Sequence, residues 1–435
     1  MKKSKKILFS FAMLSIGVTL LSVPVIAASC TTEKIKISDI KSSENVQIDK
    51  EEKSKKSIVI TDAGHVDDLS FNQSAFEGLE QISKDLGLDK ATHVIPNSES
   101  EYEKVYNEAL KNDFKYWITV GFKHTNAIKK FYNDHKEEMM NKGIVIIAVD
   151  FNASQPNVDS ENKVIDPGIP EGYSISLEYN TKESGWVAGY ASAKFLSTMS
   201  EEKRLVLSFG GGAFPGVTDF NEGYLKGILA WNQMHPETKT KHTVYSDVEK
   251  VYLQTGFVQG DKMLTHIQSA LKGKGNKVPT IVLPVAGPAT LTVVDNITDK
   301  QYIIGVDVDQ TNVVSKRKDH FFTSITKGIG QSVYDVLEGL YSKNSEKLHG
   351  FELGKTSGHN KGNIAENWTG VAKAKLDTTE NTELAQNALN EALSEFKKLS
   401  NEDKIYVSSS KAEKTGEDIT SLQARLNKLV DLVNA

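Results

Sequence analysis

The first residues that could do chemistry follow the first short apolar run beyond the N-terminal region. Asp62 offers a carboxylate, and Phe71 and Asn72 lie just before or at the start of a predicted helix. A hydrogen-bond acceptor, an aromatic face and an amide would then meet at the mouth of a cleft. A purely structural interpretation is also open, in which Asp68, Ser70 and Asn72 cap the helix and Phe71 only packs.

A pair of acids ends another apolar run, much later in the chain. Asp307 and Asp309 are two residues apart on a predicted strand, so their side chains would point to the same face. Paired carboxylates suit metal binding, acid–base catalysis or hydrogen bonding to a sugar diol. Lys327 follows and could place an ammonium in the same cleft, or it could be an ordinary solvated lysine.

The glycine-rich stretch at residues 209–217 (FGGGAFPGV) lacks the features of a phosphate-binding loop. It has no Gly-Lys-Ser/Thr, and Pro215 stands where the third glycine of a dinucleotide fingerprint belongs. A turn that brings the backbone close to a ligand or a neighbouring strand is the better interpretation. The sequence also lacks H-E-x-x-H and G-x-S-x-G motifs, and only His65 with Asp67 and Asp68 forms a local cluster that could hold a metal. We therefore expect no catalytic residue, no metal and no cofactor.

Cys30, the only cysteine, ends what looks like a secretory signal. A basic start at residues 1–6 precedes an apolar stretch at residues 7–28, and small residues stand before the thiol. One cysteine cannot make an internal disulfide, so acylation of a bacterial lipobox-like site explains this thiol best. The alternative is an uncleaved anchor, because residues 7–28 are just long enough to span a bilayer. Either interpretation places the rest of the chain outside the cytoplasmic membrane and attached to it.

The composition limits what the body of the chain can be. About 400 residues remain after the signal, a length typical of two or three domains. The formal net charge is -5, and lysines and arginines are dispersed along the sequence. Nothing in this distribution resembles the basic footprint of a nucleic-acid-binding protein.

The elements that must position these residues alternate in type. Short β-branched runs begin at Ser57 and are separated by stretches with helical spacing. Strands that are apolar throughout and alternate with helices predict parallel sheets covered on both faces. Two such sets of similar size predict an α/β protein with two doubly wound lobes and a cleft at the carboxyl ends of the strands.

The predicted organisation has five parts. Residues 30–56 are charged and almost free of aromatic side chains, which predicts a disordered tether. Residues 153–173 are rich in proline, glycine and asparagine and predict a long inserted loop. The parts are a signal peptide at 1–29, the tether at 30–56, an N-terminal α/β lobe at 57–175, a second lobe at 176–375 with chain crossovers between lobes, and a helical segment at 376–435.

These motifs, in this order, resemble the basic membrane protein family of lipoproteins. Members of that family are purine-nucleoside receptors of ABC transporters with a type I periplasmic-binding fold. The similarity covers roughly residues 57–345 and continues more weakly to about residue 407. The matching residues are 61, 62 and 64; 68 and 70–74; 120–122; 148–150; 183–190; 210 and 211; 220, 223 and 224; 305–307, 309 and 310; and 323, 324 and 327.

The resemblance implies a site in which a purine base lies between two phenylalanine rings. The first ring corresponds to Phe71 and the second to Phe257, with Phe214 as the alternative. Acids and a lysine bind the ribose in such receptors, which implies this role for Asp307 and Lys327.

Further site residues follow from the same resemblance. Asp62 and Asn72 would bind the base, and Gly287 would let the backbone approach the ligand. Asn126 stands where the family often has aspartate, a departure that bears on which base is preferred. The implied ligand-binding residues are Asp62, Phe71, Asn72, Asn126, Phe257, Gly287, Asp307 and Lys327.

The resemblance also implies partners and a location. The expected partners are a purine nucleoside, an ABC permease, and membrane lipid through an acylated (palmitate-bearing) Cys30, without nucleic acid. The protein would be lipid-anchored at the extracellular face of the cell membrane, similar to a mollicute surface lipoprotein. Receptors of this kind close on their ligand about hinges, which we expect near Asp150 and residues 284–287.

Three alternatives to this function stay open. The first keeps the fold but binds a sugar or another small polar metabolite. The second is a surface adhesin or antigen with no transport role. The third is an enzyme, such as a nucleoside hydrolase that uses Asp307 and Asp309.

Overall fold

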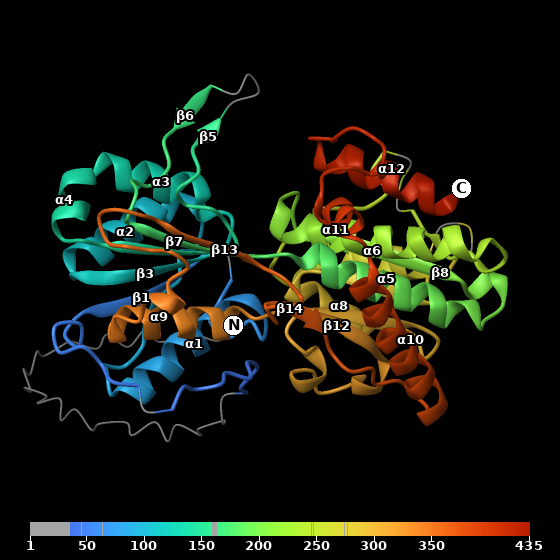
Figure 1. The fold of residues 1–435 in the computed structure, drawn as a ribbon. Helices are drawn as coiled ribbons and strands as arrows, with labels where there is room; N and C mark the ends of the chain where they lie inside the picture. The colour runs from blue at the N-terminus through green and yellow to red at the C-terminus, as the bar shows by residue number, and fades with distance from the viewer. Residues whose placement is uncertain are drawn as a thin grey trace, which may run out of the picture. The chain divides into compact units, whose positions relative to one another are not determined.

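A computed structural model describes residues 35–44, 46–62, 64–158, 163–244, 246, 248–273, 275 and 277–435. The predicted signal at residues 1–29 and the predicted lipidation site, Cys30, lie outside these residues. Lys36–Ala435 form one compact unit, and this unit contains two α/β lobes followed by C-terminal helices, as predicted (Figure 1). No helix in the described part of the chain is long and apolar enough to cross a bilayer.

The first lobe is built on a six-stranded sheet in the order β13-β7-β4-β3-β1-β2, in which all neighbours are parallel. Runs such as VIIAV in β4 are buried along their whole length, because helices cover both faces. One face carries α1 and α9, and the other carries α2, α3 and α4 (Figure 1). The strands are β1 (Lys56–Thr61), β2 (Thr92–Val94), β3 (Phe114–Val120), β4 (Val145–Val149), β7 (Ser174–Tyr179) and β13 (Gly358–Gly362). The helices are α1 (Phe71–Leu86), α2 (Tyr102–Lys111), α3 (His124–Asp134), α4 (Lys136–Asn141) and α9 (Ile329–Ser342).

The second lobe repeats this plan, with a sheet in the order β14-β12-β11-β10-β8-β9 and only β14 antiparallel to its neighbour. Helices α5 and α6 pack on one face, and α7 and α8 pack on the other. The strands are β8 (Leu205–Gly210), β9 (Lys241–His242), β10 (Ile281–Val285), β11 (Tyr302–Asp307), β12 (Phe321–Lys327) and β14 (Thr369–Val371). The helices are α5 (Thr181–Ser197), α6 (Pro215–Met234), α7 (Asp261–Lys272) and α8 (Gly287–Asn296).

The chain crosses between the lobes three times. It enters the second lobe after Tyr179, returns to the first after Lys327, and leaves again after Gly362. The hinges expected near Asp150 and residues 284–287 are therefore wrong, because both positions lie in connections within a single lobe. The crossings also give α9 and β13 to the first lobe, although both lie inside the range predicted for the second.

The structure differs from the disordered tether that was predicted before β1. Residues 36–55, which we call the strap, lie against α1 and α9 of the first lobe. Ile40, Val46 and Ile48 pack on the apolar cluster of these helices, and the Asp49 N–H donates to the carbonyl of Tyr341 at 2.8 Å. Widely spaced apolar residues in a charged segment were enough to bind it to a neighbouring surface.

Three helices end the chain and pack on α5 and α6 of the second lobe. They are α10 (Thr379–Lys398), α11 (Asn401–Ser408) and α12 (Leu422–Asn434). A buried ion cluster fixes α12 to α6: the Glu222 carboxylate lies 2.6 Å from Arg425 Nη2 and 2.9 Å from Lys182 Nζ. Lys226 Nζ, also on α6, donates to the backbone carbonyls of residues 406, 407 and 409. These hydrogen bonds attach the C-terminal end of α11 to α6.

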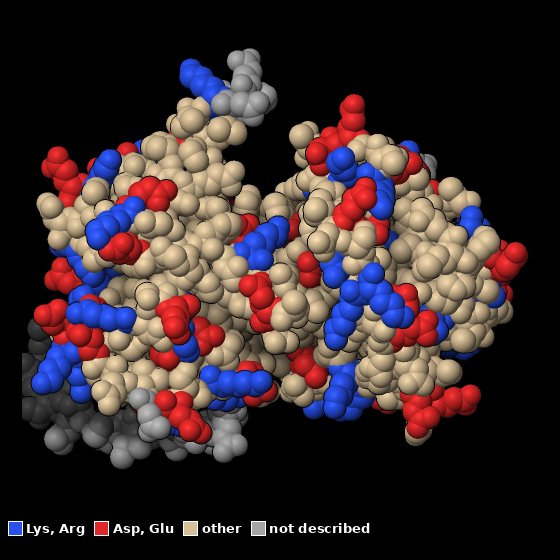
Figure 2. Space-filling model, in the orientation of Figure 1, with Lys and Arg blue, Asp and Glu red and all other residues tan. Residues whose placement is uncertain are grey.

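The predicted insertion at residues 153–173 contains a small two-stranded hairpin, formed by β5 (Asn157–Val158) and β6 (Val164–Asp166). The charge of the molecule is dispersed, as the composition indicated. On the face drawn in Figure 2, acidic and basic side chains are interspersed over both lobes.

Candidate functional site

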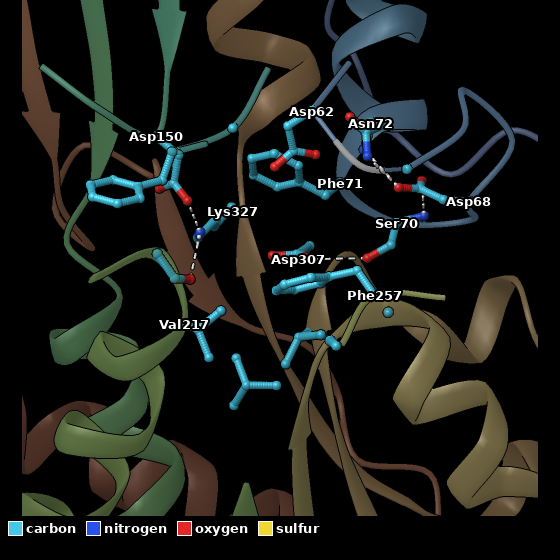
Figure 3. A pocket seen from close by; sticks show the side chains of 18 of the residues that line it. Asp62, Asp68, Ser70, Phe71, Asn72, Asp150, Val217, Phe257, Asp307 and Lys327 are labelled. Carbon is cyan, nitrogen blue, oxygen red and sulfur yellow. Dashed lines mark hydrogen bonds and ion pairs between the residues drawn. The ribbon is translucent and has the colours of Figure 1, made fainter. Parts of the chain in front are cut away.

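A pocket of about 600 Å³ lies where the carboxyl ends of the two sheets meet, and both lobes line it. This space includes the part of the pocket that is open to solvent. The structure brings together seven of the predicted ligand-binding residues here: Asp62, Phe71, Asn72, Phe257, Gly287, Asp307 and Lys327 (Figure 3). Asn126 is not among the lining residues. It is exposed on the first turn of α3 and does not reach the pocket.

The loop before α1 combines both interpretations of its sequence. The Asp68 carboxylate caps α1 by accepting from the N–H groups of Ser70, Asn72 and Gln73 at 2.9–3.1 Å. Burial raises the pKa of Asp68, and these donors oppose that rise. Phe71 and Asn72 nevertheless line the pocket, and the buried Oδ1 of Asn72 has no hydrogen-bond partner among the described residues.

Asp307 ends β11 and meets the first lobe directly. Ser70 Oγ donates to its carboxylate at 2.9 Å across the pocket (Figure 3). Burial raises the pKa of Asp307 to about 6; Lys327 and the Ser70 hydroxyl oppose the rise, and the charges of Asp150 and Asp68 add to it. Gly287 makes this approach possible, because a Cβ there would lie 2.5 Å from the Cβ of Ser70.

Lys327 ends β12 and connects the lobes at a second point. Its Nζ lies 2.9 Å from the carboxylate of Asp150 and donates to the carbonyl of Gly216 at 3.2 Å. The same ammonium lies 5.0 Å from the ring centre of Phe220 and 5.4 Å from that of Phe71, which is cation–π range. The side chain is buried and paired, so the alternative of a solvated surface lysine is wrong.

The second acid of the predicted pair has another role. Asp309 accepts from the N–H and the hydroxyl of Thr311 and caps a short 3₁₀ helix (Gln310–Asn312). It does not line the pocket. The positive φ of Asp307, 66°, ends the regular strand, so the alternation that would place Asp309 on the same face no longer applies. An enzyme mechanism with these two carboxylates as partners therefore has no support in this geometry.

The aromatic side of the pocket comes largely from the second lobe. Phe257 and Phe214 both line it, with ring centres 5.8 Å apart, and Phe214 stacks on Phe122 of the first lobe at 5.3 Å. Gly211 lets the Phe257 ring lie against the backbone, because a Cβ there would be 2.6 Å from the ring. The glycine-rich backbone thus lies against a ring of the pocket, while its predicted approach to a ligand or a neighbouring strand stays a prediction.

Sequence reasoning gave no role in the site to three residues, Ser70, Phe122 and Asp150. The sequence indicates a helix cap at Ser70 and a hinge at Asp150. Phe122 is only one of the residues that match the family. Phe122 and Asp150 each come just after a buried strand, β3 and β4, as Asp62 does after β1. The rule that strand ends meet at one edge of a sheet would have found both.

Comparison with known proteins agrees with this architecture. Residues 55–353 match the family described as ABC transporter substrate-binding protein, PnrA-like. The ABC transporter nucleoside-binding protein BmpA of Lactococcus lactis is 26% identical over 302 residues, which are 65% of this chain and 74% of that protein. Basic membrane protein B of Borreliella burgdorferi is 24% identical over 294 residues, 66% of this chain and 74% of that protein.

The fold has solved counterparts as well. A crystal structure of ABC transporter system solute-binding proteins from Aeropyrum pernix superposes with a TM-score of 0.56 at 18% identity, covering 81% of this chain and 89% of that one. The two doubly wound lobes are those of type I periplasmic-binding proteins, and the predicted resemblance to the basic membrane protein family is confirmed. The family match covers more than half of the sequence, so the chain belongs to the PnrA-like family of ABC transporter substrate-binding proteins, which are binding proteins and not enzymes.

Proposed function

We propose that this protein captures purine nucleosides for an ABC transporter. One observation carries the proposal: the rings of Phe71 and Phe257 line the same pocket as the carboxylates of Asp62 and Asp307 and the ammonium of Lys327. A flat base can stack on such rings, which contributes about 1–3 kcal/mol per base. A ribose diol can donate to carboxylates. The name of the Lactococcus lactis relative, a nucleoside-binding protein, supports the same ligand class.

Calorimetric titration of the purified protein with guanosine and adenosine tests this proposal. Phe71→Ala and Phe257→Ala should each weaken binding by roughly five- to 150-fold, the equivalent of about 1–3 kcal/mol. Asn126→Ala is the matched control, because this exposed side chain does not reach the pocket and its loss should leave the dissociation constant unchanged. If only Phe257→Ala is silent, Phe214 becomes the second stacking ring.

The ribose assignment has its own measurement. Asp307→Ala should weaken ribonucleosides more than the matching 2′-deoxynucleosides, because the lost acceptor serves the diol. An equal loss of affinity for both ligand types would contradict the proposal that Asp307 accepts a hydrogen bond from the ribose diol. If the wild-type protein does not bind nucleosides at millimolar concentration but binds free ribose, it is a sugar receptor. If it binds neither ligand, the adhesin or antigen alternative is favoured.

We also propose that the protein is held at the extracellular face of the cell membrane by acylation of Cys30. The support is the position of this single thiol after a basic and then apolar stretch. In cells that express the gene, Cys30→Ser should move the protein from the detergent phase to the aqueous phase and change the mass of the processed chain. An unchanged partition and mass would contradict the lipid anchor and leave residues 7–28 as a membrane span.

A further inference from the structure

The strap donates two backbone N–H groups to a buried carboxylate in α1. The N–H of Ile37 lies 3.1 and 3.2 Å from the two carboxylate oxygens of Glu77, and the N–H of Ser38 donates to one of them at 2.8 Å. Glu77 is only 2% exposed. A carboxylate so far from water needs donors of this kind, because an unsatisfied buried charge is strongly unfavourable. The strap therefore supplies two of the N–H donors that hold this carboxylate.

The same carboxylate is connected to the pocket through one side chain. Gln73 donates from Nε2 to Glu77 at 2.9 Å, and its Oε1 accepts the N–H of Leu69 at 3.2 Å. The carboxylate cannot donate, so it fixes which end of the Gln73 amide faces the loop. Leu69 has a φ of 54°, an unfavourable conformation for a leucine, which the surrounding contacts must hold. Ser70, the next residue, donates to Asp307 in the pocket.

An apolar contact runs beside these hydrogen bonds. Ile37 of the strap and Leu69 of the loop belong to one cluster, whose other members include Val313 and Val314 of the second lobe. Ser38 also lies against Gly330, where a Cβ would come within 2.9 Å of its hydroxyl oxygen, just after the chain has crossed between the lobes. The strap thus shares one apolar cluster with the binding loop and the second lobe, and it lies against the start of α9.

We propose that the strap positions the ligand-binding loop at residues 65–71 through Glu77 and Gln73, which act as positioning residues and do not touch the ligand. The family match begins at residue 55, so all of the strap except its last residue lies outside the matched range. Only the effect on ligand affinity rests on the nucleoside proposal. The effect on the loop does not need a ligand.

Amide hydrogen exchange of the full chain without ligand is the first test. Glu77→Gln leaves a single acceptor oxygen, so its NH₂ group must face either the strap N–H groups or the donor end of Gln73. Exchange at the amides of residues 69–71 should rise roughly two- to tenfold, the range for loss of one hydrogen bond. Ser38→Pro removes the strap N–H that donates to Glu77, together with the side-chain hydrogen bond to Ser74 at 2.8 Å, and should give a rise in the same amides.

Gln331→Ala is the matched control, because Gln331 also holds the strap but does so from α9. Its Oε1 accepts the N–H of Lys41 at 2.7 Å, and it has no contact with the loop. The control should leave exchange at residues 69–71 unchanged. If Glu77→Gln and Ser38→Pro leave these amides unchanged, or if Gln331→Ala raises them equally, the proposal is wrong.

Nucleoside titration is the second test and separates the two proposals. Glu77→Gln should weaken binding by roughly two- to tenfold, and Gln331→Ala should not. A wild-type protein without nucleoside affinity would overturn the proposed function, while the exchange result would still decide the role of the strap. An altered loop with unaltered affinity would limit the role of the strap to loop order and remove its effect on binding.

Discussion

Asp150 and Asp307 stand at matching places in the two lobes. Asp150 follows β4 and Asp307 ends β11, each of which is the fourth strand from the β2 or β9 edge of its sheet. Both residues have positive φ, 71° and 66°, which for a non-glycine residue is unfavourable by about 1–3 kcal/mol. Each is paired with a residue of the opposite lobe, Lys327 or Ser70. The backbone strain and the buried charge at these two positions place carboxylates in the pocket, and they lower the free energy of unfolding.

Asp307→Asn should therefore stabilise the ligand-free protein while it weakens nucleoside binding. Burial raises the pKa of Asp307 to about 6, so the folded state binds more protons than the unfolded state between the usual pKa of an aspartate and pH 6. The free energy of unfolding then falls as pH rises through that window, and it stays lower above it. Asparagine tolerates positive φ and removes the charge. At pH 7 we expect a gain of about 2–3 kcal/mol in urea unfolding.

The pH dependence of this gain is the decisive part. The difference between Asp307→Asn and the wild type should shrink as the pH falls from about 6 towards 4, and it should vanish below about 3, where the wild-type carboxyl is protonated in both states. Asp150→Asn is the matched control: it leaves the buried Lys327 without its carboxylate and should give no gain. An Asp307→Asn protein that is less stable than the wild type at pH 7 would contradict the assigned burial penalty.

At the scale of elements, the strands that consist of continuous apolar residues could be predicted from the sequence. The buried runs of β1, β4, β8, β10 and β11 have that pattern, and the residues after them gave most of the pocket. The edge strand β13 (GHNKG) has no apolar pattern, so nothing local indicates it. The order of the strap depends on a distant surface formed by α1 and α9, which composition cannot reveal. Asn126 was predicted to bind the ligand only from the resemblance to the family. In the structure it lies on an exposed part of α3 and does not reach the pocket.

The buried ion cluster that attaches α12 to α6 gives a prediction at this scale. Arg425→Met would leave the carboxylate of Glu222, which is fully buried, with Lys182 as its remaining close cation. Breaking a buried pair from one side destabilises proteins by about 3–5 kcal/mol. We expect a loss near the lower end of that range in chemical unfolding, and an unchanged dissociation constant for nucleosides, because the cluster does not line the pocket.

Lys414→Met is the control for this change. Lys414 pairs with Asp403 at 2.8 Å near the same helices, but its side chain is 43% exposed. Surface pairs of this kind contribute about 0–1 kcal/mol. Equal losses for the two variants would mean that the buried cluster has no special part in holding the C-terminal helices.

At the scale of the whole compact unit, each lobe carries its own addition. The strap lies mainly on α1 and α9 of the first lobe, and α10, α11 and α12 pack on the second. Around the pocket the lobes are joined by two polar pairs, Ser70 with Asp307 and Asp150 with Lys327, and by the stacking of Phe122 on Phe214. Elsewhere the lobes are connected by the three crossings.

The three crossings also fix when the first lobe can fold during synthesis. Its apolar face over α1 is covered by α9, whose residues Ile329, Val333 and Leu337 belong to that core, and its sheet is completed by β13 at Gly358–Gly362. A nascent chain that ends after β7 contains five of the six strands of the first sheet, but it lacks α9, which covers one face, and β13, which completes the sheet. More than three quarters of the polypeptide must therefore leave the ribosome before the first lobe can bury its core. A late-folding N-terminal lobe agrees with the proposed extracellular location, because an exported chain passes through a translocation channel while still unfolded.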